Sequence, residues 1–143
     1  MRTILASITF ALLSSILVSA QDLPLVKGMK ITKSTKIKKG TYKIDAAAIS
    51  GSSVITITGN NITIDFNNAM LKGSNRKINP DEFFGVGIVI KNSKSVTIKN
   101  LKASGYKVAL MAINTEKLIL ENCDLSYNYR QHLNSTQEKE DIS

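Results

Sequence analysis

Apolar and polar residues alternate over short stretches along most of this chain. Residues 54–58, 62–64, 96–99 and 118–121 are rich in β-branched side chains and follow a period of two or nearly so. This alternation predicts short, half-buried β-strands. Turn residues such as those at 59–61 separate them, and these tolerate left-handed backbone angles. No helical period appears after the first twenty residues, so an all-β fold is expected.

The strands recur with a fixed period. When residues 85–106 are placed above residues 107–128, apolar positions match apolar positions and asparagines match asparagines. A fixed period of this length is typical of a solenoid, in which one repeat cannot bury its own apolar face and must stack on its neighbours. The matched pairs are Val86/Val108, Ile88/Leu110, Asn92/Asn114, Val96/Leu118, Ile98/Leu120, Asn100/Asn122, Leu101/Cys123, Ala103/Leu125 and Ser104/Ser126.

Two looser copies precede this pair. In the nearer copy, residues 54–64 align with residues 88–98, and this wider offset predicts an insertion near residues 73–84. The earlier copy, residues 31–44, aligns with residues 51–64. Three to four stacked rungs are therefore expected. The aligned pairs are Val54/Ile88, Ile62/Val96 and Ile64/Ile98 for the nearer copy, and Ile37/Ile57, Tyr42/Ile62 and Ile44/Ile64 for the earlier one.

Two or three short strands in each period describe one turn of a parallel β-helix. Leucine-rich repeats share this length, but the alternation at 96–101 favours flat faces over a strand followed by a helix. Residues 61–69, 95–101 and 35–44 resemble the opening coil, the internal coil and the first rung of pectate-lyase-like right-handed β-helix proteins. The resemblance implies a right-handed, single-stranded parallel β-helix.

Family resemblance does not decide the activity. Members of that superfamily include polysaccharide lyases, glycoside hydrolases, epimerases, tail-spike adhesins and inactive scaffolds, so the fold is compatible with each. The resemblance implies recognition or processing of an acidic polysaccharide. A non-catalytic structural or adhesin scaffold, or a truncated N-terminal fragment of a larger β-helix protein, is the alternative.

The first twenty residues have the pattern of a secretory signal peptide. Arg2 precedes an apolar stretch over residues 4–18, and small residues at 18–20 predict cleavage before Gln21. An uncleaved anchor is the alternative, but the stretch is short for a membrane span. A secreted or periplasmic protein with no stable membrane anchor after cleavage is expected. Its repeats would cover 21–128, and a polar tail would cover 129–143.

The formal net charge is +8 at pH 7, and it stays positive after removal of the signal. One interpretation is binding to an acidic polymer such as a uronate-rich glycan, and the other is a solvated face. Nucleic acid is not expected for an exported chain in which Tyr42 is the one aromatic residue among these lysines. The excess is concentrated in one stretch: Lys27, Lys30, Lys33, Lys36, Lys38, Lys39 and Lys43.

Candidate chemistry within the repeats is sparse. Cys123 occupies an inward position, so a buried small hydrophobe is expected, and a nucleophile would need a base. Asp65, Lys99 and Glu121 align on successive coils and predict outer-face ion pairs in preference to catalysis. The repeated asparagines predict structural side-chain ladders. No metal-ligand spacing and no cofactor motif are evident, and calcium is possible only by family resemblance.

Two segments interrupt the repeat, and such breaks are where solenoids carry function. The phenylalanines of the first break could grip a sugar ring or fold back over the edge of the helix. Any enzyme activity would be that of a polysaccharide lyase or glycoside hydrolase, with unknown catalytic residues. The candidate substrate-binding residues are Arg76, Lys77, Asp81, Phe83 and Phe84 in the first break, and Tyr127, Arg130 and His132 in the second.

The C-terminal end of the repeats is expected to be uncapped. Residues 129–143 offer few apolar side chains, whereas the pattern after Asn128 predicts another rung. Unpaired strand edges recruit other strands. The sequence therefore predicts either truncation relative to longer relatives or self-association through the last rung.

Overall fold

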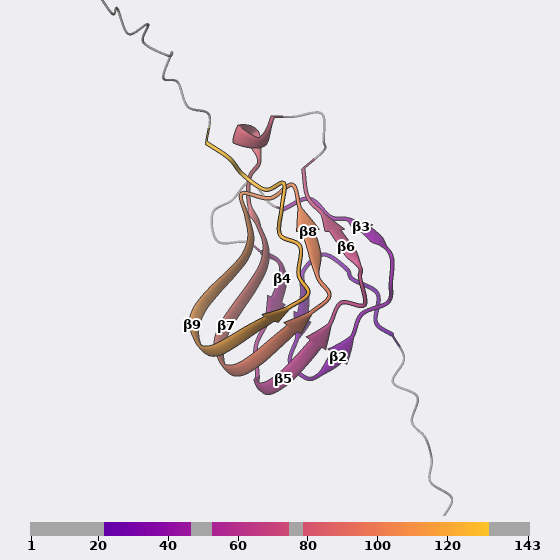
Figure 1. Ribbon diagram of the computed structural model, residues 1–143, viewed down its shortest axis with the longest axis vertical. Coiled ribbons are helices and arrows are strands. Elements are labelled where there is room, and N and C mark those ends of the chain that lie inside the picture. The colour runs from indigo at the N-terminus through magenta and orange to yellow at the C-terminus, as the bar shows by residue number, and fades with distance from the viewer. Residues whose placement is uncertain (1–21, 47–52, 75–78, 132–143) are drawn as a thin grey trace, which may run out of the picture.

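The computed structural model describes residues 22–46, 53–74 and 79–131. In these residues the chain forms parallel strands that stack side by side in a curled sheet, and one short 3-10 helix, η1 (Pro80–Glu82) (Figure 1). The fold is all-β, as predicted. The strands are β1 (Met29–Ile31), β2 (Thr35–Lys36), β3 (Thr41–Lys43), β4 (Ser53–Ile57), β5 (Asn60–Asp65), β6 (Met70–Lys72), β7 (Val86–Lys99), β8 (Lys102–Ser104) and β9 (Val108–Glu121).

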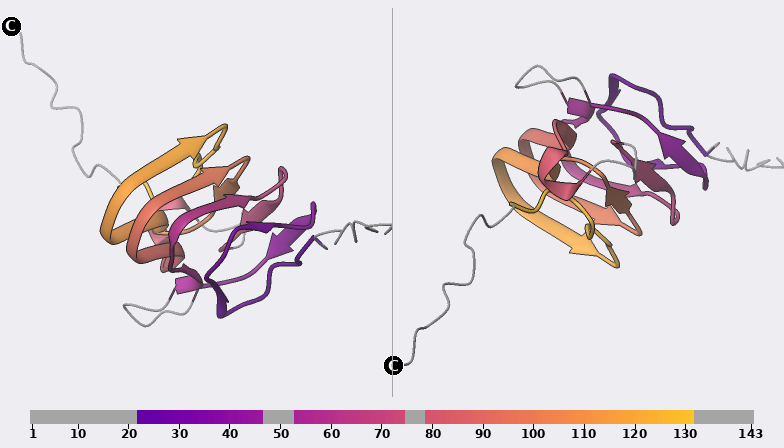
Figure 2. Two further views of the ribbon diagram at one scale, coloured as in Figure 1. Left: turned by 90° about the horizontal axis from the view of Figure 1, so that it is seen from below. Right: turned by 90° about the horizontal axis from the view of Figure 1, so that it is seen from above.

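The strands divide into two parallel sheets. One sheet has the order β1-β4-β7-β5-β2, with β9 added on β7, and the other has the order β3-β6-β8. Strands β7 and β9 are long and bend in the middle, so that each covers two sides of the stack (Figure 2). β4 and β5 pair with the two halves of β7. This arrangement is consistent with a β-solenoid.

The period predicted from the sequence is confirmed by the pairing of β7 with β9. Val86 lies beside Val108, Val96 beside Leu118 and Ile98 beside Leu120. The asparagine ladders are also present: the Asn114 amide donates to Asn92 Oδ1 at 2.9 Å, and Asn122 donates to Asn100 at 2.8 Å. These asparagines have positive φ angles, so they form the bends as well as bridging them.

The predicted alignment of the nearer copy is correct for β5 and wrong by one position for β4. Ile62 and Ile64 pair with Val96 and Ile98 as predicted, but Ile55, not Val54, pairs with Ile88. The slip arises at the bend, because the connection from β4 to β5 is one residue shorter than the matching part of β7. The Gly59 amide donates to Ser93 Oγ at 3.1 Å across this bend.

The predicted alignment of the N-terminal copy, residues 31–44 on residues 51–64, is wrong. Ile31 pairs with Ile57, and Tyr42 pairs with Leu71 and not with Ile62. The partner of Ile31 is displaced by an even number of residues, which alternation alone cannot detect. The partner of Tyr42 lies beyond the bend at Asn67 and Asn68, which interrupts the alternation after β5. The correct partners place β1, β2 and β3 on β4, β5 and β6.

One apolar core runs through the stack. Of the six inward residues predicted from the register, four are buried, Leu118 is half-buried, and Leu120 in the last layer is 44% exposed. Thr63 and Ile119 face outward, as predicted, and are exposed. The orientation of the strands is therefore confirmed. The four buried residues are Ile62, Ile64, Val96 and Ile98.

Several predictions fall on residues outside the described ranges. The signal peptide at 1–20, the candidate site residues Arg76, Lys77 and His132, and most of the polar tail belong to this group. Among the residues that the structure describes, no helix has the length and apolar character needed to cross a bilayer.

Candidate functional site

The two segments that interrupt the repeat lie against each other. The rings of Phe83 and Tyr127 meet edge to face, with centroids 5.7 Å apart and an interplanar angle of 62°. The Arg130 amide donates to the Pro80 carbonyl at 3.4 Å, and the Lys107 amide donates to the Phe84 carbonyl at 3.2 Å. The structure thus brings together candidate residues that are far apart in the sequence.

Not all of these residues are available to a ligand. Phe83 is buried against Tyr127, which favours the interpretation that it folds back rather than the interpretation that it grips a sugar ring. Phe84 is 38% exposed and Tyr127 is 53% exposed. Asp81 lies on η1 and is exposed, as is Arg130. Among the predicted site residues that the structure describes, Tyr127 therefore has the most accessible aromatic ring.

Short-range hydrogen bonds shape the first segment. Pro80 begins η1, where its fixed φ suits a helix start, and Glu82 accepts the Asn79 amide through Oε2 at 3.0 Å. This capping contact holds the turn that precedes Phe83. This fixed turn holds Phe83 in the position from which its ring contacts the ring of Tyr127.

Tyr106 anchors the second segment to the core. Its hydroxyl donates to the Ile44 carbonyl at 2.9 Å, and burial raises the pKa of the Tyr106 phenol well above its ordinary value. The Tyr106 amide donates to Asn128 Oδ1 at 3.1 Å, and its carbonyl accepts the Tyr129 amide at 2.9 Å. The chain on both sides of Tyr127 is thereby fixed.

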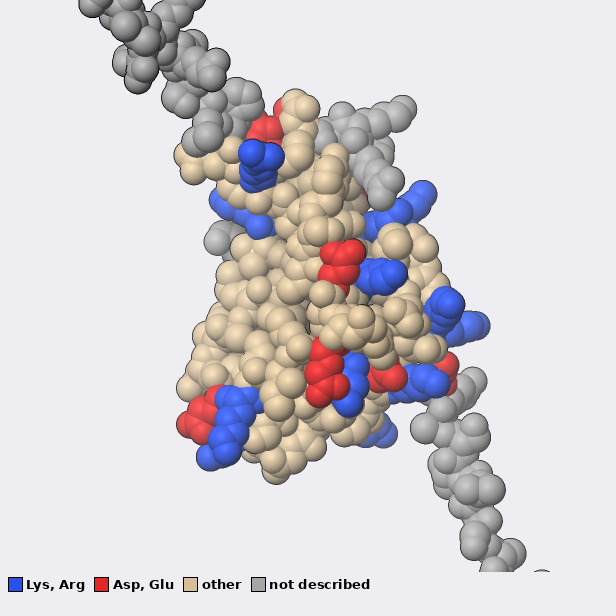
Figure 3. All heavy atoms as spheres, in the orientation of Figure 1, with Lys and Arg blue, Asp and Glu red and all other residues tan. Residues whose placement is uncertain are grey.

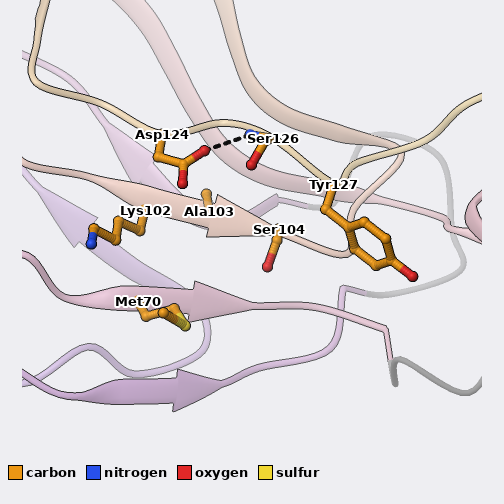
Figure 4. Close-up of a pocket in the computed structure, with 7 residues that line it drawn as sticks. All are labelled: Met70, Lys102, Ala103, Ser104, Asp124, Ser126 and Tyr127. Carbon is orange, nitrogen blue, oxygen red and sulfur yellow. Dashed lines mark hydrogen bonds between the residues drawn. The ribbon is translucent and has the colours of Figure 1, made fainter.

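A shallow pocket of about 120 Å³ lies next to Tyr127 on the outer side of β6 and β8 (Figure 4). Its residues come from successive layers, because Met70 pairs with Lys102, and Lys102 with Asp124. Ser104 and Ser126 form a second row, and Tyr127 stands at one end (Figure 4). The pocket combines one cation, one carboxylate, two hydroxyls and one aromatic ring.

Asp124 is the carboxylate of this pocket. Hydrogen bonds from Ser126, one of them from its amide at 3.0 Å, hold the pKa of Asp124 below its ordinary value, and the charge of Lys102 acts in the same direction. The carboxylate is therefore ionised at neutral pH. In this state it accepts hydrogen bonds and does not donate a proton.

The same outer face carries an oblique row of three lysines, Lys43, Lys72 and Lys102. In β3, β6 and β8 the central residues Tyr42, Leu71 and Ala103 point inward, and Leu71 and Ala103 are buried. Their neighbours therefore point outward. Figure 3 shows Lys and Arg side chains gathered on the side of the molecule occupied by β3 and β6. The outward residues are Thr41 and Lys43, Met70 and Lys72, and Lys102 and Ser104.

The sequence interpretation did not single out Lys72, Lys102, Ser104, Asp124 or Ser126 as site residues. A signal was present, since the period of the last two repeats places Lys102 on Asp124 and Ser104 on Ser126. The missing information was the register of β3 and β6, which the incorrect alignment of the N-terminal copy obscured.

The predicted ion pairing on the outer face is confirmed for Lys99 and Glu121 but not for Asp65 and Lys99. Lys99 Nζ lies 2.8 Å from Glu121 Oε2, and this contact raises the pKa of Lys99. Asp65 instead accepts the Asn100 amide at 2.8 Å. A second pair, Lys94 and Glu116, is separated by 3.1 Å. These charges lie on the other sheet, away from the pocket, and have structural partners.

Cys123 packs against the core, as its inward position predicted, but it is half-buried and not buried. Its thiol lies within hydrogen-bonding distance of the carbonyls of Ile98 and Glu121, at 3.6 and 3.4 Å. Within the described ranges, no three His, Cys, Asp or Glu side chains gather as a metal site would require.

Comparisons with known proteins do not identify a relative. No protein-family model matches the chain, and neither the curated proteins nor the solved structures contain a match to it.

Proposed function

We propose that the chain is an exported right-handed parallel β-helix that binds an acidic polysaccharide on the outer face of β3, β6 and β8. The regular pairing of β7 with β9 supports the helix. Right-handedness is the ordinary sense for connections between parallel strands of one sheet. Four turns account for the strands, each turn contributing one segment to each of three sides.

The row of Lys43, Lys72 and Lys102 carries this proposal. These lysines come from three successive layers, and adjacent parallel strands are about 4.8 Å apart. Lys43 pairs with Lys72, whereas Lys102 lies one layer on and two positions along the strand from Lys72, beside Met70. A linear polyanion lying obliquely across the stack would therefore meet a new lysine at each layer. A ligand with regularly spaced carboxylates, such as a polyuronate, fits this arrangement better than a single anion.

The pocket beside Tyr127 supplies complementary contacts for a sugar. The exposed face of the Tyr127 ring offers a stacking surface, and Ser104 and Ser126 offer hydroxyl groups. Asp124 accepts hydrogen bonds from sugar hydroxyls, while Lys102 attracts a uronate carboxylate. Glycoside hydrolysis ordinarily uses a protonated and an ionised carboxyl group on either side of the bond. The ionised Asp124 fits binding better than cleavage.

A binding measurement with matched variants tests the proposal. The variant carrying Lys43→Gln, Lys72→Gln and Lys102→Gln removes three charges from the proposed face. Its control carries Lys30→Gln, Lys91→Gln and Lys117→Gln, which removes three exposed charges from the other sheet. Both variants have the same net charge, so nonspecific attraction is equal between them.

Binding to polygalacturonate is measured at salt concentrations of about 0.01 M and about 1 M, where the Debye length falls from roughly 30 Å to roughly 3 Å. We expect the first variant to lose most of the binding seen at low salt and the control to keep it. Equal losses of binding in the two variants would mean that the lysines act only through the net charge of the protein. Absence of binding by the wild type would favour the scaffold alternative.

Export is a separate part of the proposal, supported by the composition of residues 1–20. N-terminal sequencing of the protein recovered after export should begin at Gln21. Recovery of the uncleaved chain in the membrane fraction would contradict it.

A further inference from the structure

We propose that the outer edge of β9 pairs in antiparallel fashion with the same edge of a second copy of the chain. The two copies would be related by a twofold axis that passes beside Thr115. This association uses the open end of the strand stack. It does not involve the lysine row on β3, β6 and β8, so it is independent of the proposed polysaccharide binding.

The first observation is the exposure of the last layer. In the described part of the chain, β9 pairs only with β7, so the backbone groups along its other edge have no strand partner there. Leu120 is 44% exposed, whereas Ile98, at the equivalent position one layer below, is fully buried. An edge strand with exposed apolar side chains is a template for pairing with another strand.

The second observation is a palindrome in the inward positions. Ile88, Ile90, Ser93, Val96 and Ile98 of β7 are all buried. Their partners in β9 are separated along the chain by two, three, three and two residues, a series that is the same from either end of the strand. These partners are Leu110, Ala112, Thr115, Leu118 and Leu120.

Such a spacing makes the edge self-complementary. With the axis beside Thr115, Leu110 of one copy lies opposite Leu120 of the other, and Ala112 lies opposite Leu118. Every inward residue then meets an inward residue, and the exposed part of each apolar side chain is covered by the second core. An isologous contact of this kind closes at two copies. The bend, where Asn114 and Lys117 have positive φ angles, need not join the ladder.

The charges along the edge agree with this register. Glu121 lies opposite Ala109 and diagonal to Lys107 of the other copy, and diagonal neighbours across antiparallel strands are within reach of long side chains. Glu116 lies opposite Asn114. No two glutamates face each other directly, and Lys107, whose ammonium lies over the Tyr129 ring, adds a second cation near Glu121 to its existing partner Lys99.

The opposite end of the stack is less suited to receive β9. Leu23 forms a parallel bridge with Ile37, so residues 22–24 already cover the outer edge of β2. This register places Asp22 beside Lys36, and a head-to-tail contact would bring Asp22 toward Glu121 of the next copy. Like charges at the contact oppose that arrangement, which favours the twofold one.

Sedimentation of the full chain over a range of concentrations tests the association. We expect a monomer–dimer equilibrium, with Leu120→Lys raising the dissociation constant by at least ~10-fold. The control is Ile119→Lys, which changes an equally exposed residue that faces away from the core. It should leave the dimer intact. Circular dichroism verifies that both variants remain folded.

A cysteine placed on the axis distinguishes the twofold arrangement from any other. In a Cys123→Ser background, Thr115→Cys should form a disulfide between two copies on mild oxidation, and Ile119→Cys should not. A dimer without the Thr115→Cys cross-link would overturn the proposal in favour of head-to-tail contact. A wild-type monomer at every concentration would also overturn it. The lysine-row variant should dimerise normally.

Discussion

The Asn100 side-chain amide donates a hydrogen bond of 2.8 Å to Asp65 Oδ1, and its own Oδ1 accepts the amide of Asn122 at 2.8 Å. Three successive layers are thereby joined through side chains at one bend. Asn100 and Asn122 also have positive φ angles of 55° and 51°. Asparagine meets both needs, since it tolerates this backbone region and carries a donor and an acceptor.

Substitution of Asn100 by Ala should lower the free energy of unfolding more than substitution of Asn122 by Ala. Both changes place Ala at positive φ, but Asn100→Ala removes two hydrogen bonds and Asn122→Ala removes one. The difference should be about 1 kcal/mol. Urea unfolding of the two variants measures it, and equal losses would mean that the ladder contributes only through the backbone angles.

Acid should weaken the fold in part through Asp65. Partial burial raises the pKa of Asp65, but the Asn100 and Asn67 hydrogen bonds and the charges of Lys36 and Lys99 outweigh it, so the pKa lies below its ordinary value. A carboxyl group with a lowered folded pKa stabilises the fold above its unfolded pKa of about 3.9, and this contribution is lost as pH falls through the folded value.

The variant Asp65→Asn isolates this contribution. It should be less stable than the wild type near pH 7, and the two free energies of unfolding should converge as the pH falls below about 4. Thermal unfolding monitored by circular dichroism at several pH values measures this. A constant difference across the pH range would contradict the assignment.

The sequence was sufficient for the pairing of β7 with β9, because asparagines at the bends mark the register independently of the apolar pattern. Asn92 and Asn114 are such markers. It was insufficient for β1, where alternation alone matches several shifts, and for β3, whose partner β6 lies beyond a bend that interrupts the alternation. The lysine row was missed for the same reason, since Lys43 and Lys72 come together only in the correct register.

The contact between the two interrupting segments was also beyond the sequence pattern. Phe83 and Tyr127 were both candidates, but nothing local indicates that their rings meet. That contact depends on where Tyr106, buried among residues of earlier layers, fixes the chain. Tertiary packing of this kind has no periodic signal along the chain.

Gly73 should not tolerate a side chain, because the backbone packs closely against Gly105 and Tyr106 at this position. A Cβ at Gly73 would lie 2.5 Å from the Gly105 carbonyl oxygen and 2.7 Å from the Tyr106 ring. Gly73→Ala should destabilise the fold by about 1–3 kcal/mol through overpacking. Gly40→Ala is the control, because its nearest contacts are at 3.5 Å or more. Comparable losses in urea unfolding would refute the packing seen around Tyr106.

Equivalent core positions in different layers should differ in their response to truncation. Ile98 lies between two layers and is fully buried, whereas Leu120, its partner in β9, is 44% exposed. Ile98→Ala should cost about 2–5 kcal/mol, the range for buried aliphatic residues, and Leu120→Ala should cost less. The measurement uses dilute protein, so that dimerisation does not contribute. Equal costs would mean that the last layer is covered.

The location of the polysaccharide-binding surface is best tested by nuclear magnetic resonance. Backbone amides are followed while an oligogalacturonate is added at low salt. We predict that the largest chemical-shift changes occur in β3, β6 and β8 and in residues 124–127, around Lys72 and Lys102. Changes confined to the lysines of the β2–β3 turn, such as Lys38 and Lys39, or the absence of changes, would contradict the account.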